Sequence, residues 1–275
     1  MQGVAAKNDA SYDLSRARAS VTGQTTIAAS TATTSLPNYI GPIGWRRPQQ
    51  GLGAEAQGVG QLWRSAVATR GLMSDLHEQF GEIDIYVFDQ LLRQRLHPAM
   101  RVLDVGCGSG RNLVYLLQSG CEVYGLDPDP ISIQVVQQLA SRLAPRLPPD
   151  NFRVESIEQT SFPEAFADAV LCSAVLHFAR DDAQFMAMLH GIWRVLRPGG
   201  LFFCRLASSI GMEQQVKPIQ GRRHRLPDGT ERYLVDEALL TSLTRELGGE
   251  LLHPLKTTVV QNQRCMTTWV VRKGA

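Results

Sequence analysis

Apolar and polar residues alternate along positions 75–272 with two periods, one typical of helices and one of buried strands. Between Asp75 and Leu96 the apolar residues recur at helical spacing and Pro98 follows, so we expect one helix there. Strands are expected at 101–105, 122–126, 152–156, 169–173 and 201–206, and helices between them at 112–119, 130–144 and 182–196. This alternation predicts an α/β fold with a mostly parallel sheet and helices on both faces.

The C-terminal part adds a hairpin, whose turn is Pro227-Asp228-Gly229, and an antiparallel pair of strands. In chain order we expect two hairpin strands, a helix and two further strands, at 224–226, 232–235, 237–247, 250–260 and 264–272. We therefore predict a Rossmann-like, seven-stranded and mostly parallel sheet with an antiparallel last strand. Ligands of such sheets bind outside the carboxyl ends of the parallel strands.

Residues 1–72 differ from the rest of the chain. Positions 24–35 are almost all Thr, Ala and Ser, and positions 41–60 are rich in Gly, Pro and Gln. Because neither stretch keeps a helical or strand period, we predict a disordered, low-complexity leader ahead of a domain at 73–275. A targeting segment stays open as an alternative, although Asp9 and Asp13 argue against a transit peptide. A second open alternative is a start codon assigned too early, with Met73 as the true first residue.

Composition narrows the class of protein. The net charge is +2, with 44% hydrophobic and 20% charged residues, which is typical of a soluble globular protein. There is no aromatic-basic stripe, so we expect no nucleic acid as partner. No apolar run of about 18 residues occurs, so we expect no membrane span. The five cysteines are odd in number and form no CxxC motif, which favours buried free thiols, a cytoplasmic location and no metal.

The most specific motif follows the first expected strand. Gly106, Gly108 and Gly110 alternate with other residues, and glycines allow positive φ and a close approach of a ligand to the backbone. Exposed N–H groups of the turn and the next helix would face that ligand. Asp104, two residues before Gly106, would repel a pyrophosphate. It suits a ligand with positive charge such as S-adenosylmethionine, which carries an ammonium and a sulfonium.

Further signals follow at coherent spacing. Asp127 ends the second strand, 17 residues past Gly110, where a carboxylate can accept both hydroxyls of a ribose. Ser156-Ile157-Glu158 closes the third strand, where the edge of an adenine would lie. Phe166 to Val170 leads into the fourth strand, and Leu196 to Gly200 precedes the fifth.

Together these motifs resemble the class I S-adenosylmethionine-dependent methyltransferases of the type 11/12-like groups, over roughly residues 75–272. The residues Arg111-Asn112 and Tyr115-Leu116 are also similar to the subgroup around the tellurite-resistance methyltransferase. Segment 264–269 is compatible with the last strand of the family. The resemblance implies that S-adenosylmethionine is the cofactor and that residues 73–275 form the methyltransferase domain.

The resemblance also implies roles for single residues. Asp104 and the Gly106–Gly108 backbone would face the methionine part, Asp127 would hold the ribose, and Ser173 would lie beneath the sulfonium. The full implied set is Asp104, Gly106, Cys107, Gly108, Arg111, Asp127, Pro128, Ser156, Ile157 and Ser173. Ser156 departs from the family, which often has an Asp there to bond the adenine amino group.

Methyl transfer is an in-line displacement, so much of the catalysis is alignment, and a hydroxyl acceptor also needs a base. We expect His177, Arg205 and Tyr86 to form the catalytic side of the site. His177 is either a base or substrate anchor, or a surface histidine. Arg205 either anchors an acidic group or pairs with an acid such as Asp84. Tyr86 either contacts the sulfonium through its ring or packs in the core.

The segment Arg222-Arg223-His224-Arg225 either meets a carboxylate or phosphate or forms a solvated, charged hairpin. We predict methyl transfer to a small molecule by a monomer or homodimer. Two rivals remain: a nicotinamide-dependent oxidoreductase, which normally lacks the acid at Asp104, and a non-catalytic protein that binds S-adenosylmethionine.

Overall fold

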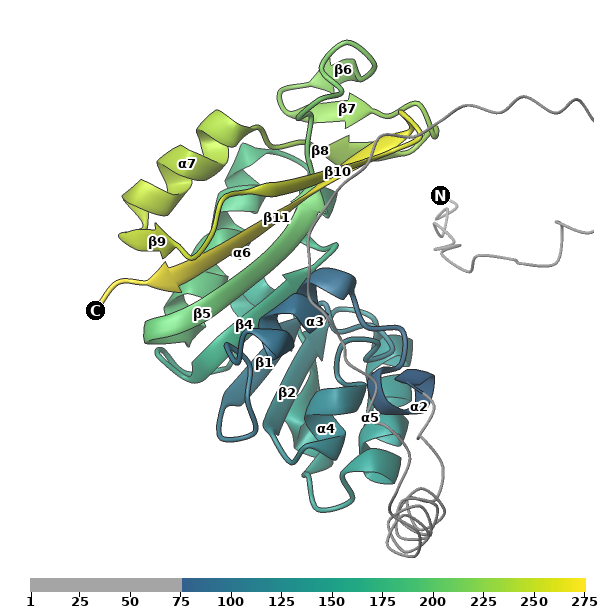
Figure 1. Cartoon of the computed structure of the whole chain (residues 1–275), viewed down its shortest axis with the longest axis vertical. Helices are drawn as coiled ribbons and strands as arrows, with labels where there is room; N and C mark the ends of the chain where they lie inside the picture. The colour runs from purple at the N-terminus through teal and green to yellow at the C-terminus, as the bar shows by residue number, and fades with distance from the viewer. Residues whose placement is uncertain (1–75) are drawn as a thin grey trace, which may run out of the picture. The chain divides into compact units, whose positions relative to one another are not determined.

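The computed structural model describes residues 76–275 (Figure 1). The predicted leader, residues 1–72, lies outside the described residues. All five cysteines lie within them, and each is free and buried, so the prediction of buried free thiols is confirmed. No helix among residues 76–275 is both long enough and apolar enough to cross a membrane.

The main sheet has the strand order β10-β11-β5-β4-β1-β2-β3. The strands are β1 Arg101–Val105, β2 Glu122–Asp127, β3 Phe152–Val154, β4 Ala167–Ser173, β5 Leu196–Ala207, β10 Lys256–Val260 and β11 Arg264–Lys273. The strands from β5 to β3 run parallel, β11 is antiparallel to β5, and β10 is antiparallel to β11. The predicted Rossmann-like, mostly parallel sheet with an antiparallel last strand is confirmed.

The single strand expected at 250–260 is wrong. The segment forms two strands, β9 Gly249–Leu251 and β10, and β9 is a short eighth member of the sheet. Leu251 is paired with Val271 of β11, whereas Lys256 is paired with Thr268. Pro254 lies between the two strands and has no N–H to donate to the ladder, which accounts for the interruption.

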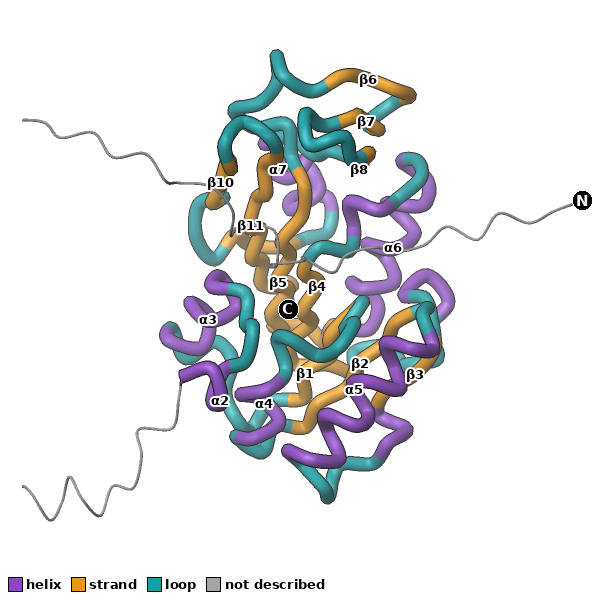
Figure 2. The backbone as a smooth tube through the Cα atoms, turned by 90° about the vertical axis from the view of Figure 1, so that its right-hand side faces the viewer, coloured by secondary structure: helices purple, strands orange, loops and turns teal. Residues whose placement is uncertain are grey.

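Helices cover both faces of the sheet (Figure 2). They are α3 Ile85–Leu92, α4 Val114–Gln118, α5 Pro130–Leu143, α6 Asp182–Val195 and α7 Glu237–Glu246. Successive side chains of a strand point to opposite faces, so Val102 packs with α3, α4 and α5 while Leu103 packs with α6 and α7. Asp129, Asp181 and Asp236 cap the starts of α5, α6 and α7 by accepting backbone N–H groups.

The one helix expected between Asp75 and Leu96 is wrong, because the segment forms α2 Leu76–Phe80 and α3. Gly81 adopts a φ of 58° and its N–H donates to His77 O, which ends α2. Asp84 then caps α3 by accepting the Tyr86 N–H. The break turns the chain so that Asp84 becomes buried beside the sheet.

A small three-stranded sheet is inserted after β5. It consists of β6 Lys217–Gln220, β7 Arg223–Arg225 and β8 Glu231–Tyr233. The predicted hairpin corresponds to β7 and β8, which pair antiparallel across the Pro227–Gly229 turn. The sequence did not predict β6. Two single-turn segments complete the site region, η3 Ile157–Gln159 and η4 Leu176–Phe178.

Candidate functional site

The glycine loop begins where β1 ends. Gly106, Gly108 and Gly110 have φ values of 66°, 51° and 81°, in the left-handed region that favours glycine. A Cβ on Gly106 would lie 2.5 Å from Val175 Cγ2, and one on Gly110 would lie 2.8 Å from Val136 Cγ2. A Cβ on Gly108 would meet nothing within 4 Å. Gly106 and Gly110 are therefore required by packing, whereas Gly108 leaves its backbone open to a ligand.

Asp127, at the end of β2, holds this loop in place. Its Oδ2 accepts the Gly108 N–H at 3.0 Å, and its Oδ1 accepts the Asp129 N–H at 2.9 Å. A carboxylate oxygen has two lone pairs, so each oxygen can accept one further hydrogen bond. Asp127 can thus take a pair of ligand hydroxyls while it fixes the loop.

Asp104 lies at the floor of the loop and is 2% exposed. Burial raises the pKa of its carboxyl to about 7, the nearby charge of Asp127 adds to the rise, and Arg111 opposes it. A cationic ligand group beside Asp104 would favour the ionised carboxylate. The residues present therefore fit the amino-acid part of S-adenosylmethionine.

The part of the site that we expect to hold the adenine is less open than the backbone at Gly108. Ile157 is 2% exposed and packs under α6, where a Cβ on Gly191 would lie 2.3 Å from Ile157 O. Ser156 is half-buried, and Pro128 is exposed. Cys107 is buried, and burial raises the pKa of its thiol well above the usual range, so the thiol stays protonated.

Four residues from separate parts of the chain form a second cluster. Asp84 Oδ2 accepts hydrogen bonds from Arg205 Nη1 at 3.0 Å and from Ser173 Oγ at 3.2 Å. Arg111 Nη2 donates to Ser173 Oγ at 3.0 Å and lies 3.8 Å from Asp84 Oδ2. The structure therefore contains the pairing of Arg205 with Asp84 that the sequence analysis proposed as one alternative.

Tyr86 adjoins this cluster. Its hydroxyl lies 2.6 Å from Thr258 Oγ1, which ties α3 to β10. The Arg205 guanidinium lies 5.3 Å from the centre of its ring, so a cation of the chain already contacts the ring. Neither observation tests the expected contact with a sulfonium.

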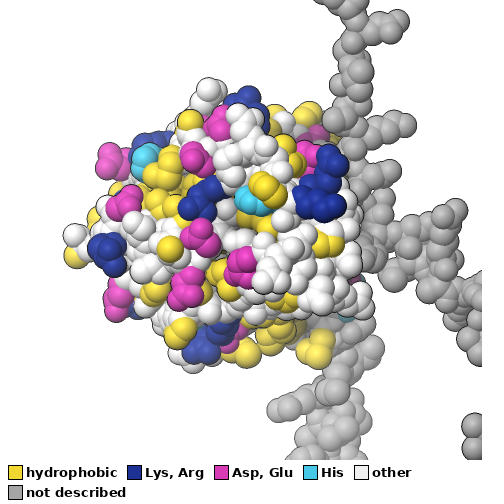
Figure 3. Space-filling view, turned by 90° about the horizontal axis from the view of Figure 1, so that it is seen from above, with side chains coloured by type: hydrophobic (Ala, Val, Ile, Leu, Met, Phe, Trp, Pro, Cys, Tyr) yellow, Lys and Arg dark blue, Asp and Glu magenta, His cyan; other side chains and the backbone are white. Residues whose placement is uncertain are grey.

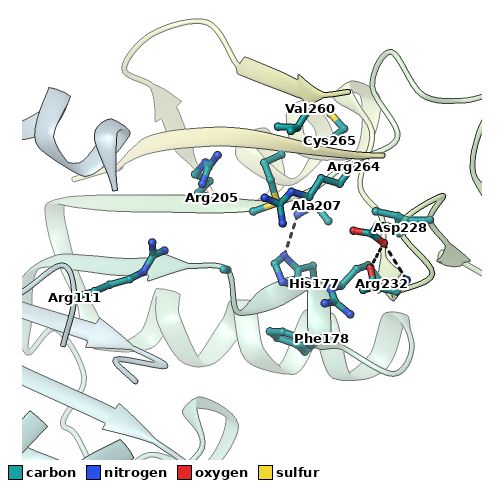
Figure 4. Close-up of a pocket in the computed structure, with 14 residues that line it drawn as sticks. Arg111, His177, Phe178, Arg205, Ala207, Asp228, Arg232, Val260, Arg264 and Cys265 are labelled. Carbon is teal, nitrogen blue, oxygen red and sulfur yellow. Dashed lines mark hydrogen bonds between the residues drawn. The ribbon is translucent and has the colours of Figure 1, made fainter. Parts of the chain in front are cut away.

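The structure contradicts one of the alternatives for His177. The side chain is 5% exposed, so it is not a surface histidine. Its Nδ1 accepts the Ala207 N–H at 3.1 Å (Figure 4), which places the proton of the neutral ring on Nε2. Burial lowers the pKa of His177 to about 3, with added effects of Arg232 and Arg205. His177 is thus a neutral hydrogen-bond donor at Nε2 and a poor general base.

A cavity of about 380 Å³ opens next to these groups, at the carboxyl ends of β4 and β5. His177, Ala174 and Ala207 contribute to its walls. Four arginines also line it: Arg111, Arg205, Arg232 and Arg264. Sequence reasoning missed Arg232 and Arg264, because only the pairing of the small sheet and of β11 brings them to this place.

The charged hairpin takes the second of its two predicted forms. Arg222 Nη1 lies 2.9 Å from Asp236 Oδ2. Arg223 and Arg225 both pair with Glu231, at 3.3 Å and 2.8 Å. None of the three lines the cavity. All three thus form ion pairs away from the cavity, and Arg232 of the same sheet lines the cavity instead.

Comparison with known proteins agrees with this geometry. Residues 103–204 match the model of a methyltransferase domain family. An uncharacterized methyltransferase of Synechocystis is 36% identical over 42% of this chain and 51% of its own length. The ubiquinone biosynthesis O-methyltransferase of Methylocella silvestris is 35% identical over 53% of this chain and 58% of its own length. The chain thus spans little more than half the length of these relatives.

Among solved structures, the 1,6-didemethyltoxoflavin-N1-methyltransferase of Burkholderia thailandensis, crystallised with 1,6-didemethyltoxoflavin and S-adenosylhomocysteine, shares the fold with a TM-score of 0.54. The two are 20% identical, and the match covers 83% of this chain and 94% of the other. The domain match at residues 103–204 and the shared fold support the likeness to class I S-adenosylmethionine-dependent methyltransferases. The resemblance drawn from the sequence is therefore confirmed.

Proposed function

We propose that this chain transfers the methyl group of S-adenosylmethionine to a small molecule. The observation that carries the proposal is the buried carboxyl of Asp104 beneath the open backbone of Gly108. A phosphate-bearing dinucleotide would place negative charge at this point, whereas an ammonium group offsets the cost of the buried carboxylate.

Different residues of the chain would bind different parts of S-adenosylmethionine. Asp104 would pair with the ammonium, Asp127 would accept the ribose hydroxyls, and the Gly108 backbone would allow close approach. Arg111 and Ser173, hydrogen-bonded to each other at 3.0 Å, would border the methyl-donating end. When bound, S-adenosylmethionine supplies an electrophilic methyl group on a sulfonium with a good leaving group.

Alignment of the acceptor is the main catalytic task that we assign to the cavity. His177 does not remove a proton from the acceptor, because its Nδ1 already accepts a backbone N–H and its pKa is lowered to about 3. Its Nε2–H can instead donate a hydrogen bond to an oxygen of the acceptor molecule and so help to orient that molecule. A volume of about 380 Å³ supports a small molecule as acceptor.

The first test is isothermal titration of the full-length chain with S-adenosylhomocysteine and, separately, with NAD. We expect micromolar binding of S-adenosylhomocysteine and no binding of NAD. Binding of NAD alone would instead support the nicotinamide-dependent oxidoreductase. Binding of S-adenosylhomocysteine without turnover of any acceptor in a broad panel would support the non-catalytic rival.

A further inference from the structure

The cavity beside His177 carries an excess of positive charge. Four arginines line it, and Asp228 is the only acidic residue among its lining residues. Positive and negative side chains are interspersed over the described surface at this end of the molecule (Figure 3). The excess of arginine is therefore a property of the cavity and not of the whole face.

Two of the four arginines share one buried carboxylate. Asp84, whose side chain is 1% exposed, lies 3.0 Å from Arg205 and 3.8 Å from Arg111. These arginines hold Ser173 and the ends of β4 and β5 together. Arg111 and Arg205 therefore contribute to the structure of the site. The other two arginines of the cavity, Arg232 and Arg264, are not part of this cluster.

Arg232, on β8, forms no ion pair among residues 76–275, although the charge of Asp228 acts on it. Its Nη1 donates to Glu231 O at 2.8 Å, and its guanidinium carbon lies 4.8 Å from the centre of the Phe178 ring. A guanidinium stacked on an aromatic ring keeps edge N–H groups available for a bidentate acceptor. Burial lowers the pKa of Arg232, the nearby charge of Asp228 opposes this effect, and Arg223 adds to it, so the compensation of its charge is incomplete.

Arg264, at the start of β11, likewise forms no ion pair with any described residue, and Figure 4 shows it near His177 and Asp228. Asp228 forms no ion pair with Arg264, and its Oδ1 accepts hydrogen bonds from Thr230 N at 2.9 Å and Thr230 Oγ1 at 2.6 Å. That carboxylate stabilises the turn between β7 and β8. The cavity thus presents two arginines outside ion pairs and the His177 Nε2–H, against the single carboxylate of Asp228.

We propose that the methyl acceptor is a small organic acid whose anionic group, a carboxylate or a phosphate, binds between Arg232 and Arg264. His177 donates a third hydrogen bond from Nε2 to the same group. The cavity extends from these residues to Ala174 and Arg111, so the reacting atom lies at that end, beside the glycine loop. This inference rests on the proposed function and names the substrate class.

The test uses the full-length chain saturated with S-adenosylhomocysteine, and titrates it with benzoate, phenyl phosphate and benzamide. We expect the better of the two anions to bind at least about tenfold more tightly than benzamide, since charge-assisted hydrogen bonds are worth more than neutral ones. Whichever of benzoate and phenyl phosphate binds more tightly shows whether the anionic group of the acceptor is a carboxylate or a phosphate. Arg232→Gln and Arg264→Gln should each weaken the binding of that anion about tenfold.

Arg225→Gln is the matched control, because Arg225 lies in the same small sheet, pairs with Glu231 and does not line the cavity. We expect it to bind the anion as the wild type does. Each variant must also bind S-adenosylhomocysteine with wild-type affinity, which shows that it folds. Equal binding of anions and benzamide, or unchanged anion binding in both cavity variants, would overturn the inference. Failure of the wild type to bind S-adenosylhomocysteine would overturn the proposed function instead.

Discussion

Asp104 affects both the stability of the protein and its affinity for a cationic ligand. Its carboxyl is 2% exposed, and burial raises its pKa to about 7. A group with such a pKa is costly to ionise in the ligand-free protein. A cationic ligand offsets that cost, so the same residue opposes folding at high pH and favours binding.

The first prediction concerns pH and stability without ligand. Between about pH 4 and about pH 7 folded Asp104 keeps a proton that the unfolded chain has lost. Its contribution to the free energy of unfolding therefore falls as pH rises through this window, by at most about 1.4 kcal/mol per pH unit. Asp104→Asn removes this contribution.

The measurement is urea unfolding of wild type and Asp104→Asn at several pH values between about 4 and about 8. We expect the variant to gain stability relative to wild type as pH rises, and the difference to level off above about pH 7. A difference that does not change with pH would contradict the raised pKa.

Single residues differ in how far the sequence reveals them. Asp104 and Asp127 could be located because each ends a strand at a fixed distance from the glycines. The role of His177 could not, because its tautomer depends on the Ala207 N–H of a neighbouring strand. Arg232 and Arg264 were missed for the same reason, since their approach to the cavity is a tertiary property.

Elements were predicted best where the pattern of burial is strict. The bounds of β1 were predicted as observed, and α5 and α6 differ from their predicted ends by one residue each. Two of the errors lie where one residue interrupts a continuous pattern, whereas β5 begins at Leu196, before its predicted start, and β6 was not predicted. Gly81 divides the first predicted helix, and Pro254 separates β9 from β10.

The contact between α6 and η3 provides a prediction at this scale. Alanine normally stabilises a helix relative to glycine, by about 1 kcal/mol. Gly191→Ala should do the reverse, because its Cβ would lie 2.3 Å from the backbone oxygen of Ile157. We expect a loss of about 1–3 kcal/mol in the free energy of unfolding.

Thermal and urea unfolding of Gly191→Ala would measure this loss. His190→Ala, at an exposed position of the same helix, is the control and should change stability by less than about 0.5 kcal/mol. Stabilisation by Gly191→Ala would show that α6 can move away from η3 at no cost.

At the scale of the whole molecule, the parallel sheet explains why the two parts of the site meet. The carboxyl ends of β1, β2, β4 and β5 share one edge, so the glycine loop and the cavity of arginines are neighbours. Arg111 follows the glycine loop and also lines the cavity. The parallel sheet could be anticipated from the alternation of strands and helices, and so could the hairpin of the inserted small sheet, but the third strand of that sheet, β6, could not.

The domain boundary yields a prediction for the chain as a whole. From the composition we predict that residues 1–72 lie outside the methyltransferase domain. Deletion of these residues should leave the melting temperature and the affinity for S-adenosylhomocysteine unaltered. A marked loss of either in calorimetry would mean that the leader is part of the folded domain.

The most direct test of the account is the affinity for S-adenosylhomocysteine of Asp104→Asn at about pH 8, measured by isothermal titration. We expect a loss of at least about tenfold, because the variant cannot supply a negative charge to the ligand's ammonium. Asp168→Asn is the control. Asp168 accepts the Arg101 N–H near the opposite edge of the sheet, so the affinity of this variant for S-adenosylhomocysteine should match that of the wild type. Unchanged binding in a folded Asp104→Asn variant would contradict the account.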